Sequence, residues 1–155
     1  MNMSEEFRIT FVCTGNTCRS PMAEVIARKL LSSSTLRDVV IGSAGVFASQ
    51  GSPASDGARW ATSEAGMDLD EHKSTPLTED IVKRSDLILT MGGSHLASVQ
   101  ELGGEGRAQR LKDYAGDFGD VLDPFGGPDH IYQATYQELH SLIERVIRRL
   151  EVERT

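Results

Sequence analysis

Short and nearly continuous apolar runs alternate along the chain with longer segments whose apolar residues recur at helical spacing. Runs of the first kind are typical of strands buried on both faces, whereas recurrence every three to four residues is typical of amphipathic helices. The apolar runs predict strands over residues 7–12, 39–43, 87–91 and 108–111. The longer segments predict helices over residues 21–31, 54–64, 78–84, 94–101 and 131–151. The last is the most regular, with a stripe formed by Ile131, Thr135, Leu139, Leu142, Ile143, Val146 and Leu150.

Strands that alternate with helices indicate an α/β fold, with a parallel sheet covered by helices on both faces. In such folds ligands bind where the strands end, at the carboxyl edge of the sheet. The chain of 155 residues is long enough for a substantial core, and it shows no repeat or linker, so residues 1–155 are expected to form one domain. The predicted loops are residues 32–37, 42–53, 103–106 and 112–129.

Composition and charge narrow the possible partners and the compartment. The chain is ordinary for a globular protein, at 39% hydrophobic and 25% charged residues, and its net charge of −7 argues against nucleic acid or an anionic membrane as a partner. Residues 1–8 are polar and acidic, so no signal peptide is expected, and no apolar stretch approaches the roughly 18 residues of a membrane span. Cys13 and Cys18 are too close together in the sequence for a disulfide between them to stabilise the fold. We therefore expect a soluble cytoplasmic protein.

The candidate chemistry lies directly after the first predicted strand, at residues 13–20 with the sequence Cys-Thr-Gly-Asn-Thr-Cys-Arg-Ser. Gly15 lets the backbone turn closely around a ligand, and Asn16 tolerates positive φ. Ser20 is expected to cap the following helix, with Pro21 at its first position. The main-chain N–H groups of such a loop, together with the positive end of the helix dipole, suit a tetrahedral anion.

A thiol beneath such a ring of donors is favoured as the thiolate, the nucleophilic form of cysteine. Cys13 would then attack phosphorus, while Arg19 would bind two phosphoryl oxygens with the fork of its guanidinium. The same loop lacks the Gly-Lys-Ser/Thr ending of a nucleotide-binding Walker loop. Taken together, these residues predict a cysteine-dependent phosphatase.

Phosphoryl transfer to a thiolate also needs an acid that protonates the leaving atom. The long predicted loop 112–129 offers five carboxyl groups, and loops of this length are usually functional. These are Asp113, Asp117, Asp120, Asp123 and Asp129. We favour Asp123, because Pro124 stiffens the backbone after it and Phe125 supplies an apolar wall beside it. On spacing alone, the other four aspartates remain candidates for the acid, and a solvated acidic loop without a catalytic role remains an alternative.

The segment from Val12 to Glu24, together with the Asp-Pro-Phe-Gly-Gly sequence that begins at Asp123, resembles the low-molecular-weight protein-tyrosine phosphatase family. Within that family the chain is most similar to the bacterial protein arginine phosphatase branch. The likeness covers nearly the full length. It implies a single-domain, three-layer α/β/α fold with a four-stranded parallel sheet and a phosphate-binding loop after the first strand. It also implies a two-step reaction through a phosphocysteine, without metal or cofactor.

The resemblance also assigns roles to particular residues. It makes Cys13 the nucleophile, Arg19 the phosphate ligand, Ser20 the support of the thiolate and Asp123 the general acid. Residues expected to contact phosphate or substrate are Thr14, Gly15, Asn16, Thr17, Cys18, Ser20 and Phe125. Residues expected to hold the loop in shape are Asn16, Ser43 and His72; on sequence alone, Ser43 is equally an ordinary turn hydroxyl and His72 a surface or capping histidine.

Thr17 bears on the choice of phosphoryl group. Tyrosine-specific relatives usually carry a bulkier apolar residue at this place, and a threonine is associated with phosphoarginine in the arginine phosphatase branch. Phosphorylated proteins, with phosphoarginine or phosphotyrosine, are thus the expected partners, and inorganic phosphate the expected product. The neighbouring thiol of Cys18 is expected to capture an oxidised Cys13 as a reversible disulfide, although a small buried residue is the plainer interpretation.

Other functions fit the sequence less well. An arsenate reductase coupled to thioredoxin would need further cysteines, and none follows Cys18. A phosphate-binding module without activity would not need the full set of Cys13, Arg19 and Asp123. No Gly-x-Ser-x-Gly elbow is present. The histidines lack metal-ligand spacing, so no metal is expected; they are His72, His95, His130 and His140. Trp60 is expected to be partly buried packing.

Overall fold

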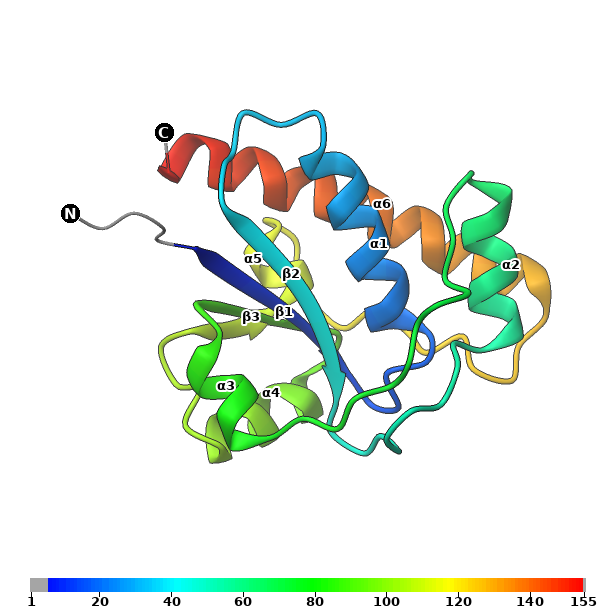
Figure 1. Cartoon of the computed structure of the whole chain (residues 1–155), viewed down its shortest axis with the longest axis horizontal. Helices are drawn as coiled ribbons and strands as arrows, with labels where there is room; N and C mark the ends of the chain where they lie inside the picture. Colours follow the sequence, from blue (N-terminus) through cyan, green and yellow to red (C-terminus); the bar gives the residue numbers. More distant parts are fainter. Residues whose placement is uncertain (1–5, 155) are drawn as a thin grey trace.

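The computed structural model describes residues 6–154, and these form a parallel four-stranded sheet between helices. The strands lie in the order β2-β1-β3-β4, so the first strand is central (Figure 1). Their bounds are β1 (Phe7–Cys13), β2 (Val39–Gly45), β3 (Leu87–Thr90) and β4 (Ala108–Arg110). The four predicted strands and the α/β class are confirmed. Residues 1–5, where most of the polar N-terminal segment falls, lie outside the described residues.

Six helices connect or follow these strands within the described range. They are α1 (Arg19–Leu31), α2 (Asp56–Glu64), α3 (Glu79–Arg84), α4 (Gly93–Glu101), α5 (Leu111–Tyr114) and α6 (Asp129–Arg154). In Figure 1, α1, α2 and α6 lie on one side of the sheet and α3 and α4 on the other. No helix within residues 6–154 is long and apolar enough to cross a membrane.

The alternation of side chains along β1 divides the core between the two faces of the sheet. Ile9, Phe11 and Cys13 point toward the larger apolar cluster, which α1 and α6 complete, whereas Val12 belongs to a smaller cluster with residues of α3 and α4. Successive strand residues point to opposite faces, so a strand buried on both sides is apolar at nearly every buried position. The buried exception in β1, Thr10, has a hydrogen-bond partner in Ser85 Oγ at 2.7 Å. Trp60 is half-buried against the larger cluster, as predicted.

Several boundaries differ from the predictions. β2 runs past residue 43 to Gly45, which pairs with Cys13 and bridges to Pro76. A Cβ at Gly45 would lie 2.5 Å from the carbonyl oxygen of Thr14, so only glycine allows this close approach. The predicted loop 112–129 contains the last three residues of α5, and α6 begins two residues before its predicted start and ends three residues after its predicted end.

The expected capping role of Ser20 is wrong. Helix α1 begins at Arg19, its N-cap position is Cys18, and no side chain caps it. Ser20 lies within the first turn, fully buried, where its hydroxyl meets the Cys13 thiol and the Asn16 amide. The Ser20 hydroxyl therefore forms hydrogen bonds with these two side chains and does not cap the helix, contrary to the prediction from the local Ser-Pro pattern.

Candidate active site

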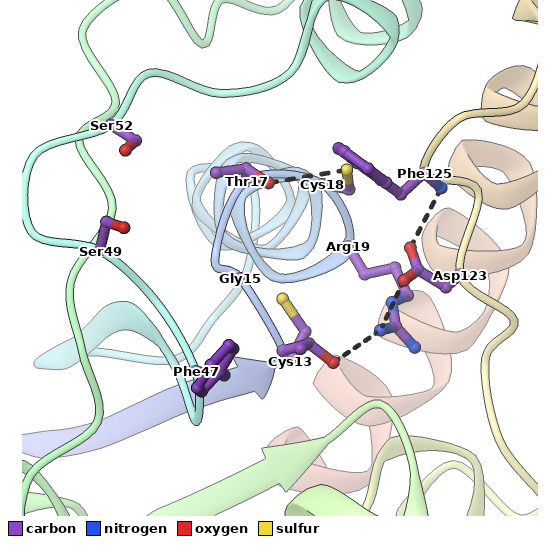
Figure 2. A pocket seen from close by; sticks show the side chains of 11 residues that line it. Cys13, Gly15, Thr17, Cys18, Arg19, Phe47, Ser49, Ser52, Asp123 and Phe125 are labelled. Atoms are coloured by element: carbon purple, nitrogen blue, oxygen red, sulfur yellow. Dashed lines mark hydrogen bonds and ion pairs between the residues drawn. The ribbon is translucent and has the colours of Figure 1, made fainter.

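A cavity of about 400 Å³ opens where β1 ends and α1 begins (Figure 2). Its lining combines the loop after β1 with residues of two later segments: Cys13, Thr14, Gly15, Thr17, Cys18, Arg19, Phe47, Ser49, Ser52, Asp123 and Phe125. The cavity thus lies at the carboxyl edge of the sheet, the place predicted from the strand and helix order. Apart from Asn16 and Ser20, which are fully buried beneath it, the residues expected to contact phosphate or substrate all line this cavity.

The loop over Cys13 offers free main-chain donors. The N–H groups of residues 14–18 donate to no other group among the described residues, and α1 starts directly behind them. Asn16 holds the left-handed conformation that shapes the loop, with φ of 57°, whereas Gly15 does not adopt positive φ. A loop of unpaired N–H groups at the N-terminus of a 13-residue helix is suited to a phosphate-sized anion.

The hydroxyl of Ser20 lies 2.9 Å from the Cys13 thiol, and its hydrogen-bond direction follows from its neighbour Asn16. The Oδ1 atom of Asn16 accepts from the main-chain N–H of Thr75 at 2.9 Å, which identifies Nδ2 as the donor end of the amide. Nδ2 then donates to Ser20 Oγ at 2.8 Å. The amide Nδ2 cannot accept in return, so among the hydrogen-bond contacts of Ser20 Oγ within residues 6–154 only the Cys13 sulfur can take the Ser20 proton, and a thiolate there would be stabilised by it.

The second N–H of the Asn16 amide continues the network outward. It donates to Ser43 Oγ at 2.9 Å, and Ser43 donates to Glu24 Oε1 at 2.5 Å. Glu24 in turn forms an ion pair with Arg28 on the next turn of α1. His72 donates from Nε2 to the Asn16 carbonyl oxygen at 2.7 Å. The structure therefore brings Asn16, Ser43 and His72 together beneath the loop.

Arg19 is buried, with 7% of its side chain exposed, and three of its contacts are fixed by the protein. Nη1 donates to the main-chain carbonyl of Val121 at 2.8 Å, Nη2 approaches Thr14 Oγ1 at 3.5 Å, and Nη2 also lies 3.6 Å from Asp123 Oδ2. Its Nε is buried without a partner among the described residues. A buried guanidinium with an unused N–H group beside the cavity is suited to bind an oxyanion.

Asp123 lies at the mouth of the cavity, opposite the loop (Figure 2). Half of its side chain is exposed, and Oδ1 accepts from the main-chain N–H of Phe125 at 3.1 Å. The adjacent Asp120 is engaged elsewhere, with Arg110 at 3.2 Å and the Gly93 N–H at 3.1 Å. Of the five aspartates in the predicted loop, Asp123 alone lines the cavity.

Cys18 and Thr17 lie on the helix side of the cavity. The Cys18 thiol contacts two hydroxyls, Ser55 Oγ at 3.2 Å and Tyr132 OH at 3.6 Å, and the Thr17 hydroxyl lies 3.8 Å from the same sulfur. Burial raises the pKa of Tyr132, so this phenol stays protonated. Both cysteines are buried and free.

The sequence did not single out Phe47, Ser49, Ser52 or the contacts of His95. The first three belong to the predicted loop 42–53 and line the cavity; Phe47 is 86% exposed, an unusual position for a phenylalanine. In Figure 2 the rings of Phe47 and Phe125 flank the Cys13 thiol from opposite sides. An aromatic residue in a glycine-rich loop after a strand is the one signal in the sequence that could have identified Phe47.

Within residues 6–154 no three His, Cys, Asp or Glu side chains gather as metal ligands.

Comparison with known proteins gives a consistent result over almost the whole chain. Residues 8–155 match the family model described as low molecular weight phosphotyrosine protein phosphatase. A protein-arginine-phosphatase of Bacillus subtilis (strain 168) is 42% identical over 149 residues, which cover 94% of this chain and 98% of that protein. The low molecular weight protein-tyrosine-phosphatase PtpB of Staphylococcus haemolyticus is 41% identical, over 90% of this chain and 96% of its own.

Among solved structures, a cysteine-to-serine mutant of the arginine phosphatase YwlE superposes with a TM-score of 0.90. It is 40% identical to this chain, and the match covers 96% of this chain and 98% of that one. That mutant carries a phosphorylated active-site serine. The fold is therefore shared in full, and in that relative a side chain at the active site accepts the phosphoryl group.

Proposed function

The chain belongs to the low molecular weight phosphotyrosine protein phosphatase family, and we propose that it removes phosphoryl groups from phosphoarginine residues of proteins through a phosphocysteine at Cys13. The observation that carries the chemistry is the position of the Cys13 thiol, 2.9 Å from a Ser20 hydroxyl that donates to it, beneath a loop of free main-chain N–H groups. This arrangement stabilises both the nucleophile and the anion that it attacks.

In the first step the Cys13 thiolate attacks phosphorus in line with the leaving atom, a sulfur–phosphorus bond forms, and the phosphorus–nitrogen bond breaks. Arg19 and the N–H groups of the loop hold the three equatorial oxygens. Asp123 protonates the leaving nitrogen, which departs as part of a guanidinium whose positive charge its other nitrogens already carried, and Asp123 is left as the carboxylate. In the second step Asp123 accepts a proton from water, which attacks the phosphocysteine and releases inorganic phosphate.

Two features of the cavity support phosphoarginine as the substrate. Thr17 is small and polar where an apolar side chain would narrow the cavity, and a guanidinium is planar and polar. The Asp123 carboxylate can pair with the charge of the leaving guanidinium, while the exposed ring of Phe125 can stack on its plane. Relatives that share 40–42% of the sequence carry the name protein-arginine-phosphatase.

Phosphotyrosine is the second candidate substrate, and one observation favours it. Phe47 and Phe125, both largely exposed, flank the cavity and offer two aromatic walls to a phenyl ring. Relatives named as tyrosine phosphatases are nearly as similar as the arginine phosphatases. For either substrate we propose phosphorylated proteins as partners and residues 1–155 as one phosphatase domain. The two free thiols favour a reducing compartment, the cytoplasm.

The deciding experiment compares kcat/KM on two peptides with identical flanks, one with phosphoarginine and one with phosphotyrosine. We expect the wild type to prefer phosphoarginine and Cys13→Ser to lose turnover on both. Thr17→Ile should shift the ratio toward phosphotyrosine by roughly tenfold, the effect of one or two methylene-sized groups in a pocket, whereas the control Thr17→Ser should keep it. A ratio that Thr17→Ile leaves unmoved would show that this residue does not set selectivity. Turnover by Cys13→Ser would refute the nucleophile.

A further inference from the structure

A histidine outside the expected set lies next to the loop. His95, in the first turn of α4, is 4% exposed, and its Nε2 lies 2.9 Å from Thr14 Oγ1. Its Nδ1 is buried with no partner among the described residues. Burial lowers the pKa of His95, and the nearby charge of Arg19 lowers it further, against smaller opposing effects of Asp120 and Asp123. The ring is therefore neutral near pH 7 and carries a single N–H.

The position of that one proton follows from the surroundings of the ring. If it were on Nδ1, a buried N–H would have no acceptor, an arrangement that folded proteins rarely tolerate. If it is on Nε2, the N–H donates to Thr14 Oγ1, and only a lone pair on Nδ1 is left without a partner. The second tautomer is the more stable here, so His95 is a hydrogen-bond donor to Thr14.

Thr14 then has two donors pointing at one oxygen. The guanidinium of Arg19 can only donate, and its Nη2 approaches the same Oγ1 at 3.5 Å. With both acceptor positions of the hydroxyl directed toward His95 and Arg19, the hydroxyl proton is left to point elsewhere. Thr14 lines the cavity that holds Cys13 and Arg19, so the remaining direction is toward a bound anion.

We infer that His95 is a positioning residue that directs the Thr14 hydroxyl proton toward the phosphoryl group. Thr14 thereby adds a side-chain donor to the main-chain donors of the loop, and the buried imidazole fixes the orientation of the hydroxyl by occupying one of its acceptor positions. The inference rests on the proposed function, since it assumes that a phosphoryl group occupies the cavity. The inference assigns a role to His95 on α4. This residue lies outside both the motif after β1 and the segment that begins at Asp123.

The first test is spectroscopic and uses the wild-type protein. The ¹⁵N shifts of the imidazoles, assigned by comparison with a His95→Gln sample, distinguish the two tautomers. We expect His95 to carry its proton on Nε2 and to be neutral at pH 7. A proton on Nδ1 would overturn the inference, because Thr14 would then have to donate to His95 and would have no proton for the anion. This readout requires no turnover and no altered fold.

The second test measures binding of inorganic phosphate by calorimetry, which also requires no turnover. Thr14→Val should weaken binding about tenfold or more, the effect of one hydrogen bond to a charged group, and Thr14→Ser should bind as the wild type does. His95→Leu should weaken binding about threefold to tenfold, because the freed hydroxyl loses its direction, and His95→Gln, which keeps a donor, should recover most of that loss.

The decisive comparison is His95→Leu made in the Thr14→Val background. If His95 acts through Thr14, the second substitution should change phosphate binding less than twofold. An undiminished loss in that background would overturn the inference. Val99→Ala, a buried change on the same helix, controls for loss of packing and should leave phosphate binding unchanged. Wild-type protein that binds phosphate but never turns over would refute the proposed function and leave the His95 assignment standing.

Discussion

The direction of the hydrogen bond between Ser20 and Cys13 can be reversed by a substitution of nearly equal size, Asn16→Asp. The amide of Asn16 donates to Ser20 Oγ at 2.8 Å, and this leaves the Ser20 proton for the Cys13 sulfur at 2.9 Å. A carboxylate at position 16 can only accept, so the Ser20 proton turns toward it and away from the thiol. The new negative charge beneath the loop disfavours the thiolate as well.

The expected magnitude follows from the bond that is lost. A hydrogen bond to a charged group contributes about 1.5–3 kcal/mol, and bonds to sulfur belong at the lower end of that range. Every 1.36 kcal/mol corresponds to a tenfold change in the ratio of thiolate to thiol. We therefore expect Asn16→Asp to lower the rate of Cys13 alkylation by iodoacetamide at pH 6 roughly tenfold or more, with a parallel loss in kcat/KM.

Ser43→Ala is the matched control for this experiment. It removes the other acceptor of the Asn16 amide, at 2.9 Å, but leaves the Ser20 bond and its direction intact. Alkylation should then slow less than threefold. The substituted proteins are compared at equal folded fraction, measured by circular dichroism. If folded Asn16→Asp protein is alkylated as fast as the wild type, the Ser20 proton does not support the thiolate and the reasoning fails.

Three further outcomes follow from the structure. Asp123→Asn should slow the first chemical step by roughly 10²–10⁴-fold, and most for substrates with poor leaving groups. Pre-steady-state kinetics with a graded set of aryl phosphates measures this dependence. An equal loss of rate for all of these substrates would contradict the assignment of Asp123 as the acid. Gly57→Ala should destabilise the fold by about 1–3 kcal/mol in urea unfolding, because the new methyl group would overlap the ring of Tyr132. Gly66→Ala is the comparison: the space around Gly66 is open and its φ is +81°, so this substitution measures the cost of backbone strain without steric overlap. Peroxide treatment should produce a Cys13–Cys18 crosslink by mass spectrometry, and its absence would leave Cys18 as a packing residue.

Much of the fold was predictable because its signals are local. The apolar run of β1 and the stripe of α6 depend on residues that are neighbours in the sequence, and both elements form within a few residues of their predicted ends. The turn of the loop after β1 was equally predictable, because Asn16 is one of the few residue types that tolerate the positive φ it adopts there. Only the capping role of Ser20 was wrong: the local Ser-Pro pattern favoured a helix cap, whereas the hydroxyl contacts the Cys13 thiol, the partner that the family resemblance implied.

The parts of the site that sequence did not reveal depend on contacts between distant segments. His95 meets Thr14 across 81 positions, and Tyr132 meets Cys18 across 114. Nothing near His95 in the sequence marks it as different from a histidine on any other helix. The register of the sheet brings His95 to the site. β3 pairs with β1 so that Thr90 lies beside Val12, and this places the start of α4 next to the loop. Only the assembled sheet contains that information.

The bond from Arg19 to the Val121 carbonyl has a consequence for both halves of the reaction cycle. One guanidinium ties the start of α1 to the backbone two residues before Asp123, the proposed proton donor, so the side chain proposed to bind the phosphoryl oxygens also holds the segment that carries the acid. A lysine there would conserve the charge but lacks the rigid, planar fork of donors with which Arg19 reaches its neighbours in a fixed geometry. In the proposed reaction, phosphoryl binding and alignment of the acid therefore depend on the same side chain, and a substitution of Arg19 should impair both.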